Sequence, residues 1–219
     1  MSFSNWEFFS DTGINISEDN GSPLVGNGSL LVDATGTGDR AFSGNVTVAS
    51  GIAIGLARGK LRTIVNVASH TAGYRFGLSC LNSQKDMTIA GNGYGLLIRQ
   101  LDSSSIDTQL ELVKITGGLT GTIEVLASSS NNPSGIDGGI DFVIELEWQL
   151  DTLDLGGVHL VARAATGTNF GTMTEILEAQ DFVSPHTSTV SEGFIGLYSS
   201  TPELATIRCD TTEIVSQTV

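Results

Sequence analysis

The chain has 219 residues, of which 10 are basic and 24 acidic, so its formal net charge at neutral pH is −14. A surface with this charge repels phosphate, which argues against binding to nucleic acid or to an anionic membrane. No run of apolar residues reaches the length of about 18 that a membrane-spanning helix needs.

Apolar and polar residues alternate through most of the chain, with turn-forming residues between the alternating runs. This pattern predicts strands. They are Asn5–Phe9, Ser29–Asp33, Arg40–Phe42, Lys60–Ala68, Tyr74–Leu81, Met87–Ile89, Gly95–Leu101, Gln109–Thr116, Thr122–Ala127, Phe142–Asp151, Val158–Ala165, Gly193–Ser199 and Thr206–Val215. Thr172–Ala179 fits a strand or a short helical stretch, and Glu18–Pro23 and Ser128–Gly139 are expected to be loops.

Twelve or more short strands cannot form one stable flat sheet. We therefore predict an all-β fold of two stacked antiparallel sheets, a jelly-roll sandwich, in a single domain over residues 1–219. The 27 glycines and the charged fraction of 16% agree with closely turned strands.

The strand Phe142–Asp151 carries the clearest signal. Its even positions, including Trp148, are apolar, while Glu145, Glu147 and Asp151 fall on the other side. We expect the apolar side to face the core and the acids to face water. Gln109–Thr116 is apolar on both sides, which indicates either a strand buried between two layers or a subunit interface.

Two cysteines, Cys80 and Cys209, lie in apolar strand-like segments. We expect buried free thiols rather than a disulfide. The first residues, Met1–Glu7, lack the basic and apolar regions of a secretory signal, so we expect synthesis in the cytoplasm without export.

The second half of the chain carries a recognisable series of strands. It runs from the Trp148 strand through the small apolar residues of Val158–Ala165 to Gly193-Phe194-Ile195-Gly196-Leu197-Tyr198, and it closes with Cys209–Val215. With Gly28–Val32 near the start, this series resembles the concanavalin A-like lectin/glucanase and laminin-G-like domains. The resemblance implies a concanavalin A-like jelly roll. Such domains serve as glycan-binding modules, glycosidases, adhesion modules and virion surface proteins.

Enzymatic members of that family carry a Glu-x-Asp-x-x-Glu strand. Glu145, Glu147 and Asp151 approach this motif, but the middle acid is Glu and the third falls one residue late. A solvated strand face is the favoured interpretation and a glycosidase the weaker alternative. His70, His159 and His186 are isolated in the sequence, which does not indicate a zinc site.

Calcium is a possible cofactor, because concanavalin A-like domains often bind it through loop oxygens. The candidate ligands are Asp137 and Asp141 with the carbonyls of Asn131 and Asn132. Asp102 and Asp107 form an alternative pair.

Strong acidity, few aromatic residues and the lack of a reactive constellation favour a non-enzymatic structural protein of a virus particle. A decoration or fibre-type protein on the surface of a tailed phage fits best, with other virion proteins or further copies of the chain as partners. The alternative is a carbohydrate-binding or adhesion module for a host surface glycan. Trp6, Tyr94 and Tyr198 are then the expected aromatic platforms.

Overall fold

The computed structural model describes residues 6–21, 24, 29–34, 40–46, 56–69, 74–100, 108–136, 139–151, 156–198 and 205–216. Within these ranges nearly every regular element is a strand. The strands are β1 (Trp6–Ser10), β2 (Ile14–Asp19), β3 (Ser29–Ala34), β4 (Arg40–Val46), β5 (Arg58–Ser69), β6 (Tyr74–Asn82), β7 (Gly93–Gln100), β8 (Thr108–Thr116), β9 (Thr122–Ser128), β10 (Asp141–Leu150), β11 (Val158–Thr166), β12 (Thr174–Asp181), β13 (Ser191–Tyr198) and β14 (Ala205–Ser216). Two short 3-10 helices complete them, η3 (Pro133–Gly135) and η4 (Phe170–Thr172).

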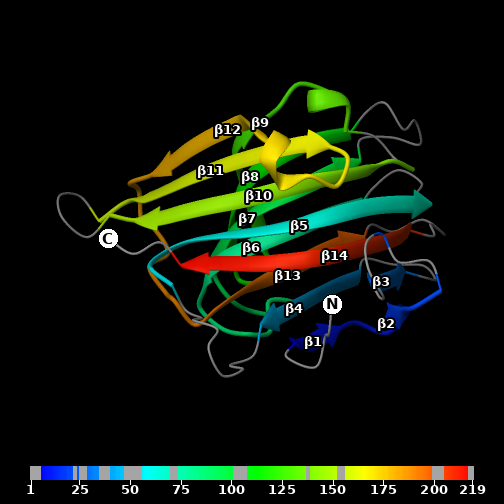
Figure 1. The fold of residues 1–219 in the computed structure, drawn as a ribbon. Coiled ribbons are helices and arrows are strands. Elements are labelled where there is room, and N and C mark those ends of the chain that lie inside the picture. Colours follow the sequence, from blue (N-terminus) through cyan, green and yellow to red (C-terminus); the bar gives the residue numbers. More distant parts are fainter. Residues whose placement is uncertain are drawn as a thin grey trace.

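The strands form two seven-stranded sheets in which every pairing is antiparallel. Sheet A has the order β1-β4-β13-β6-β7-β8-β9, and sheet B has the order β12-β11-β10-β5-β14-β3-β2. Figure 1 shows sheet B lying across sheet A, with β10 and β5 near its middle. The predicted two-sheet sandwich is confirmed. No helix in the described part of the chain is both long enough and apolar enough to cross a membrane.

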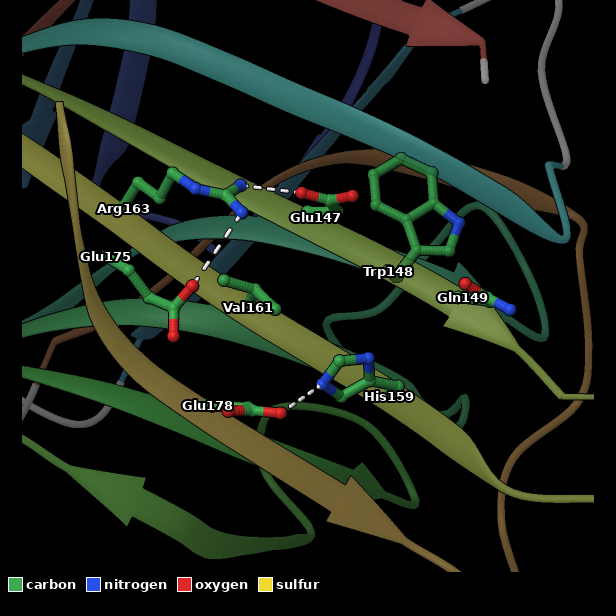
Figure 2. A pocket seen from close by; sticks show the side chains of 8 residues that line it. All are labelled: Glu147, Trp148, Gln149, His159, Val161, Arg163, Glu175 and Glu178. Carbon is green, nitrogen blue, oxygen red and sulfur yellow. Dashed lines mark hydrogen bonds and ion pairs between the residues drawn. The ribbon is translucent and has the colours of Figure 1, made fainter. Parts of the chain in front are cut away.

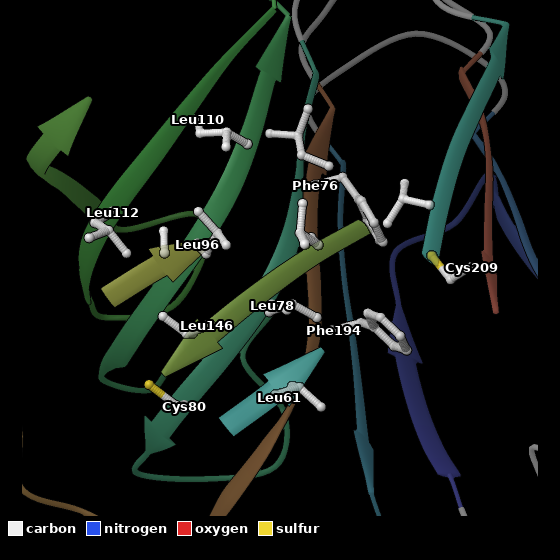
Figure 3. Close-up of a cluster of buried hydrophobic side chains, with 14 of the residues drawn as sticks. Leu61, Phe76, Leu78, Cys80, Leu96, Leu110, Leu112, Leu146, Phe194 and Cys209 are labelled. Atoms are coloured by element: carbon white, nitrogen blue, oxygen red, sulfur yellow. The ribbon is translucent and has the colours of Figure 1, made fainter. Parts of the chain in front are cut away.

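The facing sides of the two sheets form the main core. Phe142, Ile144, Leu146 and Trp148 of β10 all belong to it, so the alternation of this strand predicted its inner face correctly. Figure 3 shows Leu61 and Leu146 of sheet B packing with Phe76, Leu78 and Phe194 of sheet A. Burying such a surface is the main favourable contribution to folding.

Both cysteines are buried free thiols, as expected. Burial raises the pKa of the Cys80 thiol, and the nearby Glu192 carboxylate raises it further. Cys209 lies in the same core, where burial and then Asp210 raise its thiol pKa. Both thiols therefore stay protonated at neutral pH.

A second apolar layer covers the outer face of sheet A. Val113 and Ile115 of β8 point away from the main core and pack with Met87 and Leu119, which come from two turns of the same chain. This explains why Gln109–Thr116 is apolar on both sides: of the two interpretations, the strand buried between layers is confirmed.

Two local predictions were wrong. Met87–Ile89 forms a turn instead of a strand, because Asp86 accepts the Thr88 amide at 2.9 Å and Ser43 Oγ accepts the Met87 amide at 3.1 Å. Strand β2 was missed, and part of it was taken for a loop, because it is an edge strand with polar residues at most positions.

A buried ion pair joins the two sheets at one edge of the sandwich. Lys114 Nζ on β8 lies 2.8 Å from Asp181 Oδ2 at the end of β12. The Tyr94 hydroxyl donates to the same carboxylate oxygen at 2.6 Å and accepts the His186 amide at 2.9 Å. Since β8 belongs to sheet A and β12 to sheet B, the Lys114–Asp181 pair ties one sheet to the other.

The Asp181 carboxylate is held in its charged form. Burial alone disfavours that form, but hydrogen bonds from Lys114, Tyr94 and the Val183 amide outweigh it and lower the pKa below its ordinary value of 3.8. A carboxyl group whose pKa is lower in the folded state stabilises the fold fully above its unfolded pKa. That contribution is lost as the pH falls through the folded pKa.

The substitution Asp181→Asn should lower the free energy of unfolding by about 3 to 5 kcal/mol at neutral pH, because it leaves the Lys114 charge buried without its partner. Urea unfolding followed by fluorescence measures this difference. The difference from the native chain should shrink once the pH falls below 3.8. As a control, Glu7→Gln breaks the exposed Glu7–Lys85 pair and should cost less than about 1 kcal/mol. Equal losses for the two variants would contradict a structural role for the buried pair.

Candidate functional site

The outer face of sheet B carries polar side chains in rows that run across the strands. One row contains Arg62 of β5, Glu145 of β10 and Arg163 of β11, which are direct partners in the strand register. The register continues this row to Glu213 of β14 on one side and Glu175 of β12 on the other. Positive and negative side chains therefore alternate across five neighbouring strands.

Glu145 lies at the centre of this row and is only 4% exposed. Its Oε1 accepts a hydrogen bond from Arg163 Nη1 at 2.9 Å and lies 3.6 Å from Lys60 Nζ. Its Oε2 lies 4.0 Å from Arg62 Nη1. The expectation that the acids of this strand face water is therefore wrong for Glu145, because cations from both neighbouring strands cover it.

Glu147 lies two residues along the strand on the same face and shares Lys60 and Arg163 with Glu145. Its Oε2 accepts from the same Arg163 Nη1 at 2.6 Å and lies 3.1 Å from Lys60 Nζ. Burial disfavours the charge on Arg163, but hydrogen bonds to Glu147 and Glu145 outweigh it and raise the guanidinium pKa. Both carboxylates are thus bound to one permanently charged group.

A hollow of about 290 Å³ lies beside these ion pairs. Val161 forms part of its lining, and because Val161 is shorter than its neighbours, polar side chains from β10, β11 and β12 surround it. Figure 2 shows Glu147, Gln149, His159, Arg163, Glu175 and Glu178 around the hollow. His159 Nε2 and Glu178 Oε1 lie 2.7 Å apart on its far side. Trp148 borders the hollow, but its indole is buried and donates to the Leu56 carbonyl at 2.8 Å.

A second hollow of about 180 Å³ continues the first, since Gln149 and His159 line both. Its other lining residues are Asp151, Gly157, Val158, Gln180 and Phe182. The two hollows together form a groove along β10, β11 and β12, which we call the outer groove. It presents carboxylates, amides, an imidazole and a guanidinium, and the Phe182 ring lies at its end.

Phe170 and Met173 cover the opposite end of this face. They pack over Ile64, Val143 and Ala165, and the Phe170 ring centroid lies 4.6 Å from the Arg62 guanidinium carbon. This small apolar cluster borders the row of ion pairs at that end.

Sheet A carries a further hollow of about 300 Å³, lined by Arg75, Leu119, Thr120, Gly121, Ile123 and Leu197. Beside it Glu111 is buried between Arg75 Nε at 3.4 Å and Arg99 Nη1 at 2.9 Å. Leu119, Ile123 and Leu197 are the apolar residues that line this hollow, and Arg75 is the one charged residue among its described lining residues.

Two of the aromatic platforms expected from the sequence, Trp6 and Tyr94, line none of the three hollows. Tyr94 is 0% exposed and belongs to the core, so its prediction as a platform is wrong. Trp6 packs against the core and stacks on Phe194 with ring centroids 4.9 Å apart. Tyr198 is the last residue of β13, and its side chain lies outside the described part.

The calcium ligands proposed from the sequence are only partly described. The Asp141 carboxylate accepts a hydrogen bond from Asn66 Nδ2 at 2.7 Å. Asp137, Asp102 and Asp107 lie outside the described residues. In the described ranges, no group of three or more His, Cys, Asp or Glu side chains is arranged to hold a metal ion. Calcium binding at Asp137 and Asp141 stays a prediction.

Sequence reasoning missed most residues of the outer groove. His159 was interpreted as an isolated histidine, and Arg163 and Gln180 were not considered. Because side chains of a strand alternate between its two faces, the predicted strand Val158–Ala165 already implied that His159, Val161 and Arg163 share one face. The missing information was the register that places them beside Glu147 and Glu178.

Replacing Arg163 by Met should lower the free energy of unfolding by about 3 kcal/mol, because the buried Glu145 then loses its nearest cation. Chemical denaturation of the purified variants measures this loss. Glu175→Gln is the matched control, since it breaks an exposed contact of 3.9 Å with the same arginine and should cost less than about 1 kcal/mol. A loss for Arg163→Met no larger than that of the control would show that the ion pairs do not support the sheet.

Comparison with known proteins identifies the fold. No protein-family model matches the sequence, and no curated protein matches it either. Among solved structures, the carbohydrate binding module CBM66 from Bacillus subtilis has a TM-score of 0.51 and 14% identity, over 97% of this chain and 96% of that one.

Two further structures extend the comparison. The CBM2 module of the evolved Dit of Lactobacillus casei BL23 phage J-1 has a TM-score of 0.53 and 12% identity, over 96% of this chain and 89% of that one. The third structure is the Bacteroides ovatus GH16 of the mixed linkage glucan PUL, in complex with its G4G4G3G product. It has a TM-score of 0.57 and 9% identity, over 98% of this chain and 96% of that one. The chain therefore has a jelly-roll β-sandwich fold that is found both in carbohydrate-binding modules and in enzymes that act on polysaccharides.

Proposed function

We propose that the protein is a non-enzymatic carbohydrate-binding module whose binding site is the outer groove on sheet B. The observation that carries this proposal is the groove itself. Its two joined hollows, of about 290 and 180 Å³, are lined by hydrogen-bonding side chains from three adjacent strands. This function corresponds to the adhesion alternative drawn from the sequence.

The groove offers the hydrogen-bonding groups that sugars require. A sugar hydroxyl donates one hydrogen bond and accepts others, so it pairs with carboxylates, amides, imidazoles and guanidinium groups. Arg163 and His159 are held by Glu147 and Glu178, which fixes these polar groups before a ligand arrives. Such preorganisation lowers the entropy lost on binding. Two solved structures of the same fold are described as carbohydrate-binding modules, which agrees with this use of the fold.

The paired carboxylates of β10 favour binding over catalysis. A retaining or inverting glycosidase needs one carboxyl group that can donate a proton and a second one that attacks or activates water. Here Glu145 and Glu147 both accept from Arg163 Nη1, at 2.9 and 2.6 Å. Both acids are engaged by one guanidinium group, and Glu145 is only 4% exposed, so the pair is not open to a substrate.

We place this module on the surface of a virus particle, in keeping with the leading hypothesis from the sequence. The likeness to a module of a phage Dit supports this setting, because it shows the same fold among phage proteins. Other virion proteins or further copies of the chain are the proposed structural partners, and a host surface glycan is the proposed ligand. The net charge of −14 agrees with a partner that is not nucleic acid.

A glycan array probed with the purified chain, followed by calorimetry on the hits, tests the proposal. We expect binding with a dissociation constant of millimolar or tighter and a loss of about tenfold for His159→Ala, which removes one groove residue. Lys85→Ala is a control far from the groove, because Lys85 pairs with Glu7 on the side of sheet A. Absence of binding across the array would contradict the proposed function. Turnover of a bound polysaccharide that Glu147→Gln abolishes would contradict its non-enzymatic character.

A further inference from the structure

An exposed apolar pair follows the last strand of the outer groove. Phe182 is 48% exposed and Val183 is 80% exposed, although both are large apolar side chains. They begin the segment that leads from β12 of sheet B to β13 of sheet A. Phe182 also lines the second hollow of the groove, whereas Val183 does not.

The backbone of this pair is fixed by the buried ion pair that joins the sheets. Asp181 Oδ1 accepts the Val183 amide at 3.0 Å. Lys114 Nζ donates to the Val183 carbonyl at 3.0 Å and to the Ser184 carbonyl at 2.9 Å. Strand β12 fixes the backbone before Phe182, and these hydrogen bonds fix the backbone of Val183 and Ser184 after it. The segment therefore cannot rotate to bury its apolar side chains.

Gly157 sets the position of the Phe182 ring. A Cβ atom at residue 157 would lie 2.3 Å from Phe182 Cδ1 and 2.5 Å from Cε1, so the ring packs directly against the glycine backbone. One side of the ring thus rests on Gly157, just before β11. The ring lines the same hollow as Asp151, His159 and Gln180.

Resting on the proposed function, we infer that Phe182 is the aromatic platform of the outer groove, and that it selects neutral pyranose rings whose hydroxyl groups are equatorial, as in β-linked glucans. Such a ring exposes C–H groups on its flat faces, and the negative face of an aromatic ring attracts them. Polar residues around the platform are then placed to bind the equatorial hydroxyls at the edge of the sugar.

Charge excludes acidic sugars from this position. Asp151 lines the hollow together with Phe182, and Glu178 lies across from His159 in the adjoining hollow. A uronate carboxylate stacked on Phe182 would meet Asp151 in a hollow that no Lys or Arg residue of the described part lines, in a chain of net charge −14. We therefore expect neutral β-glucan oligosaccharides to bind more tightly than alginate or glucuronan oligosaccharides.

NMR titration with mixed-linkage β-glucan and alginate oligosaccharides tests the inference on the full chain. Stacking on Phe182 should shift C–H signals of the β-glucan upfield, and Phe182→Leu should abolish this shift and weaken binding about tenfold or more. Leucine preserves an apolar contact with Gly157, so folding can be maintained while the aromatic face is lost. Val183→Ala is the matched control, because Val183 is more exposed but does not line the groove, and it should bind as the native chain does.

The outcomes separate this inference from the proposed function. Weaker binding for both Phe182→Leu and His159→Ala, with unchanged binding for Val183→Ala, supports both. Binding that His159→Ala weakens and Phe182→Leu leaves unchanged overturns the role of Phe182 and keeps the groove as the site. Tighter binding of alginate than of β-glucan overturns the assigned class of sugar. Absence of binding by the native chain to every oligosaccharide overturns the proposed function as well.

Discussion

Charge neutralisation on the outer side of β10 is the constraint on which the candidate site depends. The inner side of this strand supplies the core, so Glu145 and Glu147, at the alternate positions, must lie on the outer face near the middle of a seven-stranded sheet. Glu145 is almost inaccessible to water there, so its negative charge is balanced by Lys60 of β5 and Arg163 of β11. The same ion pairs hold Glu147 and Arg163 of the outer groove, so the stability of the sheet and the shape of this part of the site are linked.

Much of the fold could be predicted from the sequence because burial in a strand follows a period of two residues. This period identified the inner face of β10 and the apolar character of both faces of β8. It failed where a strand lies at an edge, as β2 does, because few of its side chains are buried. It failed also at Met87, whose burial comes from a turn that covers sheet A rather than from a strand within it.

The site was much harder to predict, because it depends on contacts between residues far apart in the chain. Tyr94 was expected to be exposed, yet its hydroxyl reaches Asp181, which is 87 residues later in the sequence. A tyrosine in an alternating strand has the same local pattern whether its hydroxyl meets water or a buried partner. Phe182 follows a segment that fitted either a strand or a short helix. Neither its exposure nor its position beside His159 could therefore be predicted without the strand register.

Each sheet carries one of the two cysteines, so the reactivity of each thiol reports on the opening of its own sheet. Cys80 belongs to β6 of sheet A and Cys209 to β14 of sheet B, and both sulfhydryl groups are shielded and protonated. A thiol in this state reacts with an alkylating reagent after its own strand separates from the core. The rates at which the two cysteines are alkylated therefore measure how often each layer of the sandwich opens, one layer at a time.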